Sequence, residues 1–432
     1  MRDGVATVLS ESFAIPTCME LFTEIAKNVV DSLESDVPQE FAECRKSLLQ
    51  VAQQIARGTI QQNHRPALRD LSHRLHRLMG TFRREDRILY VCRRIHTDCC
   101  IIQSLAESFL GSPENAIAAL DHALIISGTP GHGRYMLVHE LIHHFQAAIP
   151  VLLPRETPHT IEPNAVSTDQ RRLSSTAHHI PRIPAPSILY FQTKLYNTPF
   201  IVSGYANDWP ALVDHPWKHA RYLSSVAGPG RMVPVEVGGH YLLDSWDQQV
   251  MSWDNFLSML DFEDQPAQLP SDEKHYLAQH NLFIQFPDLR DDILVPDYAY
   301  ATGFYKHLPD YKPPNNEEGI IFNHWLGPEN TISPAHIDPY NNLYVQVVGR
   351  KTVWLAPPSV SQYMVPSSTE ACLENTSHHD VFASEPDSSF QRHVVPEAMS
   401  AVLEPGDLLY FPSGWWHAMR SESTSFSLSI WF

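Results

Sequence analysis

The feature that most constrains the fold is a series of seven short β-rich runs within residues 199–432. In each run, valine, isoleucine, leucine or aromatic residues alternate with other residues, and turn-forming glycine, proline, asparagine or aspartate lies between runs. The runs are PFIVSGY, MVPVEVG, GIIFNHWLG, NLYVQVVG, KTVWLAPP, AVLEPGDLLYFP and SFSLSIWF. This pattern predicts many short antiparallel strands, and a double-sheet jelly roll is the most economical way to close them.

Residues 1–150 carry a different pattern, with apolar residues recurring every three or four positions, which indicates helices. No fixed sequence period accompanies them, so no named helical repeat is supported. The expected helical segments are Cys18–Leu33, Phe41–Ala56, Ala67–Met79, Arg87–Leu110, Ala116–Ile126 and Arg134–Ala148.

A proline-rich stretch with little periodicity lies between the two patterns and reads as a linker. We therefore predict a multidomain α+β protein. It comprises an all-helical domain over residues 1–150, a linker over 151–185 and a jelly-roll domain over 186–432.

The charge balance limits the classes of partner. The 31 Lys and Arg residues stand against 49 Asp and Glu residues, which gives a net charge of −18, and −16 of it lies beyond residue 150. No Lys/Arg-rich run could neutralise several neighbouring phosphates, so we expect no direct nucleic-acid binding. An acidic surface favours encounter with basic proteins or peptides.

The cysteines predict a reducing compartment. None of the six forms a CxxC pair, and free core thiols are expected. The start MRDGVATVLSESFAIP does not resemble a signal peptide, and no run of 18 uncharged apolar residues occurs. We expect a soluble protein of the nucleus or cytoplasm, without a membrane partner.

The candidate chemistry lies in the segment TISPAHIDPYNNLYVQVVGRKTVWLAPP. His336 and Asp338 are two positions apart, so on an extended strand both side chains project to one face. His417 follows after 78 intervening residues, in the strand-turn unit GDLLYFPSGWWH. Two imidazoles and one carboxylate form the facial triad of non-haem Fe(II) oxygenases, which leaves three coordination positions open.

Two other groups of residues could bind metal. His139, Glu140 and His143 spell HELIH, the spacing of zinc proteases, but no third ligand follows on a helix. The apolar residues around them are typical of a packing helix. The HTDCC run at residues 96–100 has no matching second cluster, so an ordinary helix is favoured there as well.

Five spaced segments, VPVEVG, YLAQHNLF, TISPAHIDPYNN, VQVVGRK and GDLLYFPSGWWH, resemble the JmjC-domain 2-oxoglutarate oxygenases, which have a cupin-like jelly roll (double-stranded β-helix). The most similar type is the lysine-specific demethylase 8 type, an arginyl hydroxylase. The resemblance covers roughly residues 185–432; for residues 1–150 it rests on helical character and position alone. It implies that His336, Asp338 and His417 bind iron.

The same resemblance implies residues for the cosubstrate. Lys351 and Tyr276 correspond to the pair that holds the distal carboxylate of 2-oxoglutarate, and an ammonium with a phenol donor suits that group. Ser333 and Asn342 correspond to further pocket positions. Ordinary alternatives are open: a solvated turn for Lys351, and turn residues for Ser333 and Asn342.

For the prime substrate, the resemblance implies Glu236, Tyr241 and Trp325. A carboxylate pairs bidentately with a guanidinium, and an aromatic face stacks on it. The alternative is structural, with Glu236 as a strand-edge charge and the two aromatic residues as core. The long polar loop Asn375–Pro396 departs from the relatives and could alter substrate choice.

The sequence thus favours an Fe(II)-dependent protein oxygenase that uses 2-oxoglutarate and O₂ as cosubstrates. The expected reaction is hydroxylation of an arginine in a basic protein, for which ribosomal, histone or other chromatin-associated proteins are candidates. Demethylation of N-methyl-lysine in histones by the same chemistry is the first alternative. A non-catalytic cupin scaffold that binds a partner is the alternative from another class.

Overall fold

The computed structural model describes residues 16–34, 41–83, 86–150, 176–239, 242, 246–268, 273–301, 311–365, 375–383 and 388–432. The chain divides into two compact units. One comprises Met1–Arg155 with Gly228–Val233, and the other comprises Glu156–Ala227 with Pro234–Phe432. The domain limits predicted from composition stay a prediction.

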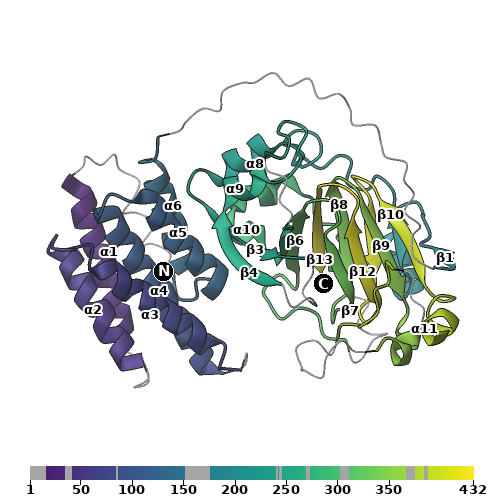
Figure 1. The fold of residues 1–432 in the computed structure, drawn as a ribbon, viewed down its shortest axis with the longest axis horizontal. Coiled ribbons are helices and arrows are strands. Elements are labelled where there is room, and N and C mark those ends of the chain that lie inside the picture. Colours follow the sequence, from purple (N-terminus) through teal and green to yellow (C-terminus); the bar gives the residue numbers. More distant parts are fainter. Residues whose placement is uncertain are drawn as a thin grey trace. The chain divides into compact units, whose positions relative to one another are not determined.

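The first unit is helical, as expected (Figure 1). The amphipathic pattern accounts for the helices, since in α2 the buried side chains are spaced three or four residues apart on one face. None of the described helices is long and apolar enough to span a membrane. The helical elements are α1 (Pro16–Glu34), α2 (Ala42–Ala56), α3 (His64–Met79), α4 (Arg87–Phe109), α5 (Pro113–His122), the π-helical turn η2 (Ala123–Ser127) and α6 (Arg134–Gln146).

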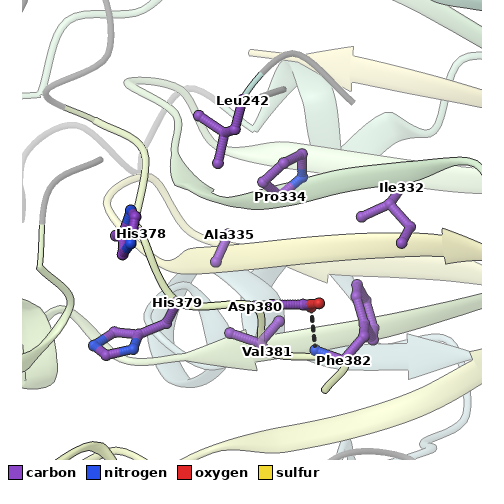
Figure 2. A pocket seen from close by; sticks show the side chains of 9 residues that line it. All are labelled: Leu242, Ile332, Pro334, Ala335, His378, His379, Asp380, Val381 and Phe382. Carbon is purple, nitrogen blue, oxygen red and sulfur yellow. Dashed lines mark hydrogen bonds between the residues drawn. The ribbon is translucent and has the colours of Figure 1, made fainter. Parts of the chain in front are cut away.

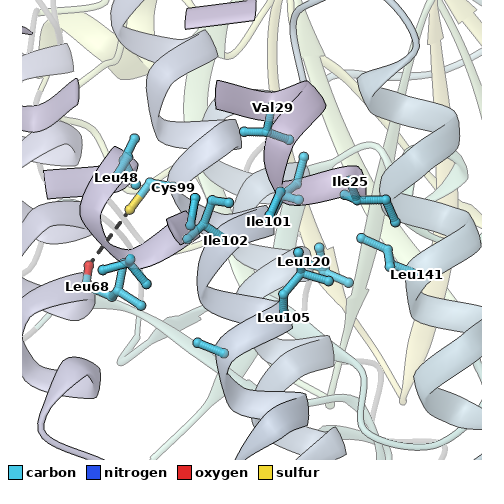
Figure 3. Close-up of a cluster of buried hydrophobic side chains, with 14 of the residues drawn as sticks. Ile25, Val29, Leu48, Leu68, Cys99, Ile101, Ile102, Leu105, Leu120 and Leu141 are labelled. Carbon is cyan, nitrogen blue, oxygen red and sulfur yellow. Dashed lines mark hydrogen bonds between the residues drawn. The ribbon is translucent and has the colours of Figure 1, made fainter. Parts of the chain in front are cut away.

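Helix α4 supplies much of the core of this unit, together with side chains from α1, α2, α3, α5 and α6 (Figure 3). Its Cys92, Cys99 and Cys100, with Cys44 of α2, are buried free thiols, as predicted. Burial raises the pKa of Cys92 to about 11 and that of Cys100 to about 12, so these thiols are protonated and unreactive near neutral pH. The side chains of Cys18 and Cys372 lie outside the described residues.

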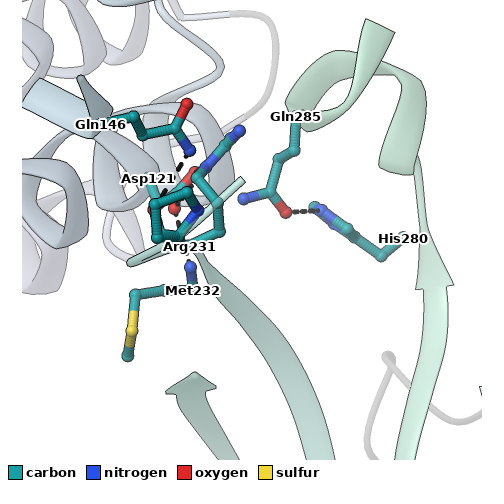
Figure 4. Close-up of polar contacts among 7 residues, drawn as sticks. Asp121, Gln146, Arg231, Met232, His280 and Gln285 are labelled. Carbon is teal, nitrogen blue, oxygen red and sulfur yellow. Dashed lines mark hydrogen bonds and ion pairs between the residues drawn. The ribbon is translucent and has the colours of Figure 1, made fainter. Parts of the chain in front are cut away.

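A short segment far along the chain completes the helical unit. Arg231 donates from Nε and Nη2 to the Asp121 carboxylate of α5 at 2.7–3.1 Å, and the backbone N–H of Met232 donates to the same carboxylate at 2.7 Å (Figure 4). Gln146 donates to the carbonyl of Pro229 at 3.1 Å. Both members of the Asp121–Arg231 pair are buried.

The second unit contains two largely antiparallel sheets, which confirms the predicted β-rich, cupin-like architecture (Figure 1). Only the edge pairing of β1 with β10 is parallel among the named strand pairs of the described residues. In order across the smaller sheet, the strands are β1 (His178–His179), β10 (Met399–Leu403), β9 (Lys351–Ala356), β12 (Trp416–Ser421) and β7 (Ile332–Ile337). In order across the larger sheet, they are β2 (Phe200–Val202), β11 (Leu408–Phe411), β8 (Asn342–Val348), β13 (Ser425–Trp431), β6 (Ile321–Gly327), β5 (His275–His280), β3 (Met232–Val237) and β4 (Asp247–Ser252).

Short helices and turns surround these sheets. Several begin at residues whose side chains accept a backbone N–H: Ser187, Ser252 and Asn281 act in this way. The helical elements of this unit are α7 (Ile188–Tyr190), η3 (Phe191–Leu195), α8 (Ala220–Ala227), α9 (Trp253–Ser258), α10 (Leu282–Gln285), η4 (Pro287–Asp292), η5 (Asp297–Tyr300), η7 (Pro358–Tyr363) and α11 (Ser388–His393).

Strands β8 and β13 lie side by side and are buried along their whole length. In β13, Ser425, Ser427 and Ser429 alternate with large apolar residues, so one face of the strand is polar and the other apolar. The register places Ser427 opposite Gln346 of β8. Ser429 on this polar face lines a pocket together with residues of β7 and β12.

Candidate metal centre

The three predicted metal ligands lie together, on neighbouring strands of the smaller sheet. His336 near the end of β7 is directly opposite His417 on β12, and Asp338 follows β7 immediately. The two rings are 4.1 Å apart between centroids. Nε2 of His417 lies 3.3 Å from Oδ2 of Asp338, and Nε2 of His336 lies 3.8 Å from Oδ1. The three potential ligand atoms all lie within 4.8 Å of one another.

Backbone carbonyls orient both imidazoles. Nδ1 of His336 is 2.8 Å from the carbonyl of Pro334, and Nδ1 of His417 is 3.1 Å from that of Trp415. Because a carbonyl can only accept, Nδ1 carries the proton in each ring, and the Nε2 lone pair is free to bind a cation.

The charges at the centre also suit a cation. Burial, with the neighbouring His417 as a second cause, lowers the pKa of His336 to about 4, so this ring is neutral near pH 7. Burial tends to raise the pKa of Asp338, but His336 and His417 together outweigh it, and the pKa lies below its usual range. Two imidazoles and one carboxylate fit the ligand set of an Fe(II) facial triad.

A pocket opens at this triad. The polar and aromatic groups around it come from strands of both sheets, as expected for the interior of a jelly roll. The lining residues are Trp325, Ser333, His336, Asp338, Asn342, Tyr344, His417, Met419 and Ser429. The predicted Trp325, Ser333 and Asn342 are therefore grouped with the triad, although their roles stay predictions.

Three lining residues were missed in the sequence. Tyr344 and Met419 could have been found by alternation, since they lie two positions beyond Asn342 and His417 on the same strands. Ser429 gave no such signal, because its strand contains no residue that the motifs singled out.

Lys351 and Tyr276 form a second buried polar group. Nζ of Lys351 lies 3.2 Å from the hydroxyl of Tyr276, and the lysine side chain is only 1% exposed. No carboxylate among the described residues forms an ion pair with Lys351, and burial lowers its pKa to about 7. The solvated-turn alternative is therefore wrong. A buried ammonium without a protein counter-ion suits an incoming carboxylate.

The place of Tyr276 depends on Gly327 of the neighbouring strand β6. A Cβ atom on residue 327 would lie 2.6 Å from Cδ2 of the Tyr276 ring. The ring of Tyr276 is also 6.0 Å from that of Trp325, between centroids. The absence of a side chain at residue 327 thus makes room for the phenol.

Glu236 lies on β3 directly opposite Tyr276 on β5. Burial raises the pKa of the Glu236 carboxyl, and the neighbouring Trp246 indole offsets part of that effect. Among the described residues, no lysine or arginine forms an ion pair with Glu236. The predicted Tyr241 lies outside the described residues.

The first part of the Asn375–Pro396 loop runs along the free edge of β7. The N–H of Ser377 donates to the carbonyl of Ala335 at 2.7 Å, and the N–H of Ile337 donates to the carbonyl of Asn375 at 2.9 Å. A second pocket lies between β7 and this loop (Figure 2). Its lining residues are Leu242, Ile332, Pro334, Ala335, His378, His379, Asp380, Val381 and Phe382. The loop therefore borders the strand that carries His336.

Residues of the two alternative metal motifs make packing, hydrogen-bond and ion-pair contacts within the helical unit. In α6, His139 is buried and its ring packs on Tyr135, 4.6 Å away between centroids. In α4, His96 lies within 3.2 Å of the hydroxyls of Ser72 and Ser127, and Asp98 pairs with Arg134 at 2.7 Å. Within the described residues, the triad of β7 and β12 is the only grouping of ligand side chains compact enough for a metal.

The β-rich part of the chain is similar to a known family of domains. The family model described as "Cupin-like domain" matches residues 191–432. A "Jumonji C domain-containing protein 5" from Drosophila melanogaster is 38% identical over 258 residues, which are 59% of this chain and 59% of the relative. A "Lysine-specific demethylase JMJ30" from Arabidopsis thaliana is 37% identical over 55% of this chain and 50% of the relative.

One relative extends into the helical part. A "Lysine-specific demethylase 8" from Danio rerio is 30% identical over 368 residues, which are 82% of this chain and 83% of the relative. The fly and plant matches, in contrast, span only 59% and 50% of those proteins. The similarity is thus long enough in one case to include residues before the jelly roll.

Proposed function

Because this chain belongs to the cupin-like, JmjC family of 2-oxoglutarate oxygenases and is homologous to lysine-specific demethylase 8, we propose that it hydroxylates an arginine side chain in a basic protein. The observation that carries the proposal is the grouping of His336, Asp338 and His417 within 4.8 Å. Bound Fe(II), with 2-oxoglutarate and O₂, supplies an oxidant that inserts one oxygen atom into a C–H bond and leaves succinate and CO₂.

The residues of this chain bind and orient the reactants. The triad would hold Fe(II) on one side, and the carbonyls of Pro334 and Trp415 keep both imidazoles turned towards it. Lys351 and Tyr276 would donate to the distal carboxylate of 2-oxoglutarate. A non-catalytic scaffold would have no use for a buried lysine without a counter-ion, which supports an enzyme.

The preference for arginine rests on Glu236. Its carboxylate is half-buried and forms no ion pair with a described lysine or arginine, so a cation from the substrate would complete it. A guanidinium can engage a carboxylate through two parallel hydrogen bonds, and the face of Trp325, which lines the pocket at the triad, offers a stacking surface. Tyr241 is included in this proposal from the sequence alone.

Demethylation of N-methyl-lysine is the second candidate. The plant and zebrafish relatives described above carry the name lysine-specific demethylase. Aromatic residues such as Trp325 and Tyr344 line the pocket, which suits a methylammonium. The chemistry is the same, because an N-methyl group that gains a hydroxyl breaks down to formaldehyde. The two reactions differ only in which substrate atom reaches the metal.

The proposal extends to location and partner. The net charge of −18 favours a basic substrate such as a histone or a ribosomal protein. The buried free thiols are compatible with the nucleus or the cytoplasm.

The test is a turnover experiment with matched peptides. The protein is incubated with Fe(II), 2-oxoglutarate and O₂ together with a basic peptide that carries either arginine or N-methyl-lysine at the same position. Intact mass then distinguishes the gain of one oxygen atom, expected for arginine, from the loss of one methylene, expected for demethylation.

The triad variants His336→Ala and His417→Ala are the controls. Each removes one of three metal ligands and no member of the apolar core clusters, so turnover should be lost while the fold persists. Full succinate formation by either variant would contradict the assignment of the metal centre.

A further inference from the structure

Two buried side-chain amides, those of Gln346 and Asn342, lie on the polar face between β8 and β13. They differ in how many of their hydrogen-bonding groups have partners within the protein. Gln346 donates from Nε2 to the hydroxyl of Ser425 at 2.9 Å and to the carbonyl of Val348 at 2.6 Å. Its Oε1 accepts from the hydroxyl of Ser427 at 2.8 Å. Both ends of this amide therefore bind within the protein.

Asn342 has only one end engaged. Its Oδ1 accepts from the hydroxyl of Ser429 at 2.8 Å, and no described residue accepts from its Nδ2. Asn342 and Ser429 are almost fully buried, with 3% and 1% of their surfaces exposed. Both line the pocket that contains the metal triad. The Nδ2 group thus remains available to a ligand in that pocket.

We propose that Ser429 is a positioning residue that fixes the amide of Asn342 so that its NH₂ group, not its oxygen, faces bound 2-oxoglutarate. This inference rests on the proposed function, and it assigns a role to a residue that the motifs do not include. The carboxylate and keto oxygens of 2-oxoglutarate only accept hydrogen bonds. A turned amide would present an acceptor to them and would oppose binding.

The physical reason lies in the free protein. Without the Ser429 hydroxyl, Oδ1 of Asn342 has no donor at its present position, and the amide can turn so that Oδ1 faces water in the pocket. Binding 2-oxoglutarate would then force that oxygen back to a dry position without a donor. We expect the dissociation constant for 2-oxoglutarate to rise roughly 5- to 150-fold in Ser429→Ala.

The experiment measures 2-oxoglutarate binding by calorimetry with Mn(II) in place of Fe(II), so that no turnover occurs. Ser425→Ala is the matched control, because Ser425 lies on the same face of the same strand, is fully buried and contacts Gln346. It does not line the pocket. Its affinity for 2-oxoglutarate should stay close to that of the wild type, and Mn(II) binding should be unchanged in both variants.

A double-mutant cycle separates positioning from a general disturbance of the pocket. If Ser429 acts through Asn342, then Ser429→Ala should add no further loss in an Asn342→Ala background. Ser429→Cys, with its weak S–H donor and similar volume, should bind 2-oxoglutarate with intermediate affinity and serves as a second variant should Ser429→Ala not fold.

The outcomes distinguish the two proposals. Failure of the wild type to bind 2-oxoglutarate would overturn the proposed function itself. Binding by the wild type with equal binding by Ser429→Ala, or with losses that add in the double variant, would overturn only the role of Ser429.

Discussion

Lys351 is a buried cation whose charge depends on what it binds. Burial lowers its pKa to about 7 in the ligand-free protein, whereas a bound carboxylate stabilises the ammonium form and raises the pKa. Below pH 7 the lysine is already charged before the ligand arrives. Above pH 7 a proton must be taken up on binding.

We therefore predict that 2-oxoglutarate binding weakens as the pH rises above about 7, by up to about tenfold per pH unit. Calorimetry at pH 8 in buffers of different ionisation enthalpy should show the uptake of nearly one proton per ligand. Lys351→Arg is the control, since arginine stays charged throughout this range. A flat pH profile in the wild type would mean that Lys351 is charged without its ligand.

Substitutions of Glu236 and Lys351 should affect different reactants. The first should weaken use of the peptide substrate, and the second should weaken use of 2-oxoglutarate. Glu236→Ala removes the proposed partner of a guanidinium, so kcat/KM for an arginine peptide should fall at least about 30-fold while 2-oxoglutarate binding stays intact. Lys351→Ala should instead raise the 2-oxoglutarate requirement roughly 10- to 150-fold. Both titrations are made with each variant. Equal effects of the two changes on both titrations would show that one residue is misplaced.

The sequence predicts individual residues well where local geometry is sufficient. His336 and Asp338 are two positions apart on one strand, so their common face follows from the strand period. The contact of Ser429 with Asn342 could not be predicted in this way, because it depends on β13 lying next to β8. Nothing in either segment alone specifies that neighbour.

At the scale of elements, the close approach of β5 and β6 is sensitive to volume. Gly327→Ala would place a Cβ atom 2.6 Å from the Tyr276 ring and 3.1 Å from Cγ2 of Thr331. We predict a loss of about 1–3 kcal/mol in the free energy of unfolding and weaker 2-oxoglutarate binding, because the Tyr276 hydroxyl moves relative to Lys351. Chemical denaturation and calorimetry measure the two effects.

Gly80→Ala is the control for that prediction. Residue 80 has a negative φ of −66°, and the nearest atom to an added Cβ lies 3.5 Å away, which is an ordinary contact. Its stability should change by less than about 1 kcal/mol. Unchanged stability and binding in Gly327→Ala would mean that the Tyr276 ring can move aside without cost.

Helices were easier to predict than the arrangement of strands. The expected segment Arg87–Leu110 became α4 (Arg87–Phe109), and Phe41–Ala56 became α2 (Ala42–Ala56), because the helical period is local. The π-helical turn η2 was not predicted, since its residues continue the same apolar pattern. Strand order was beyond prediction because β13, the last strand, pairs in the middle of the larger sheet.

At the scale of the whole molecule, the Asp121–Arg231 pair is the contact whose loss should matter most to the helical unit. Asp121→Ala would leave a buried guanidinium and the N–H of Met232 without this acceptor. We predict a loss of about 3–5 kcal/mol in the free energy of unfolding, measured by urea denaturation with helical circular dichroism as the signal.

An exposed ion pair provides the comparison. Lys218 and Glu263 lie 2.8 Å apart with 43% and 59% of their side chains exposed, so Glu263→Ala should cost less than about 1 kcal/mol. A loss in Asp121→Ala no greater than that in Glu263→Ala would show that the buried pair contributes little net stability.

The late position of Arg231 in the sequence determines when its contact with Asp121 can form during synthesis. Arg231 lies 85 residues after Gln146, the end of the last helix of its unit. At about 5–20 residues per second, the ribosome needs roughly 4–17 s to make that stretch. During this interval Asp121 has been made but still lacks the guanidinium that it contacts in the finished protein. The helical unit, although encoded first, therefore gains its Asp121–Arg231 contact only after the ribosome has passed the start of strand β3.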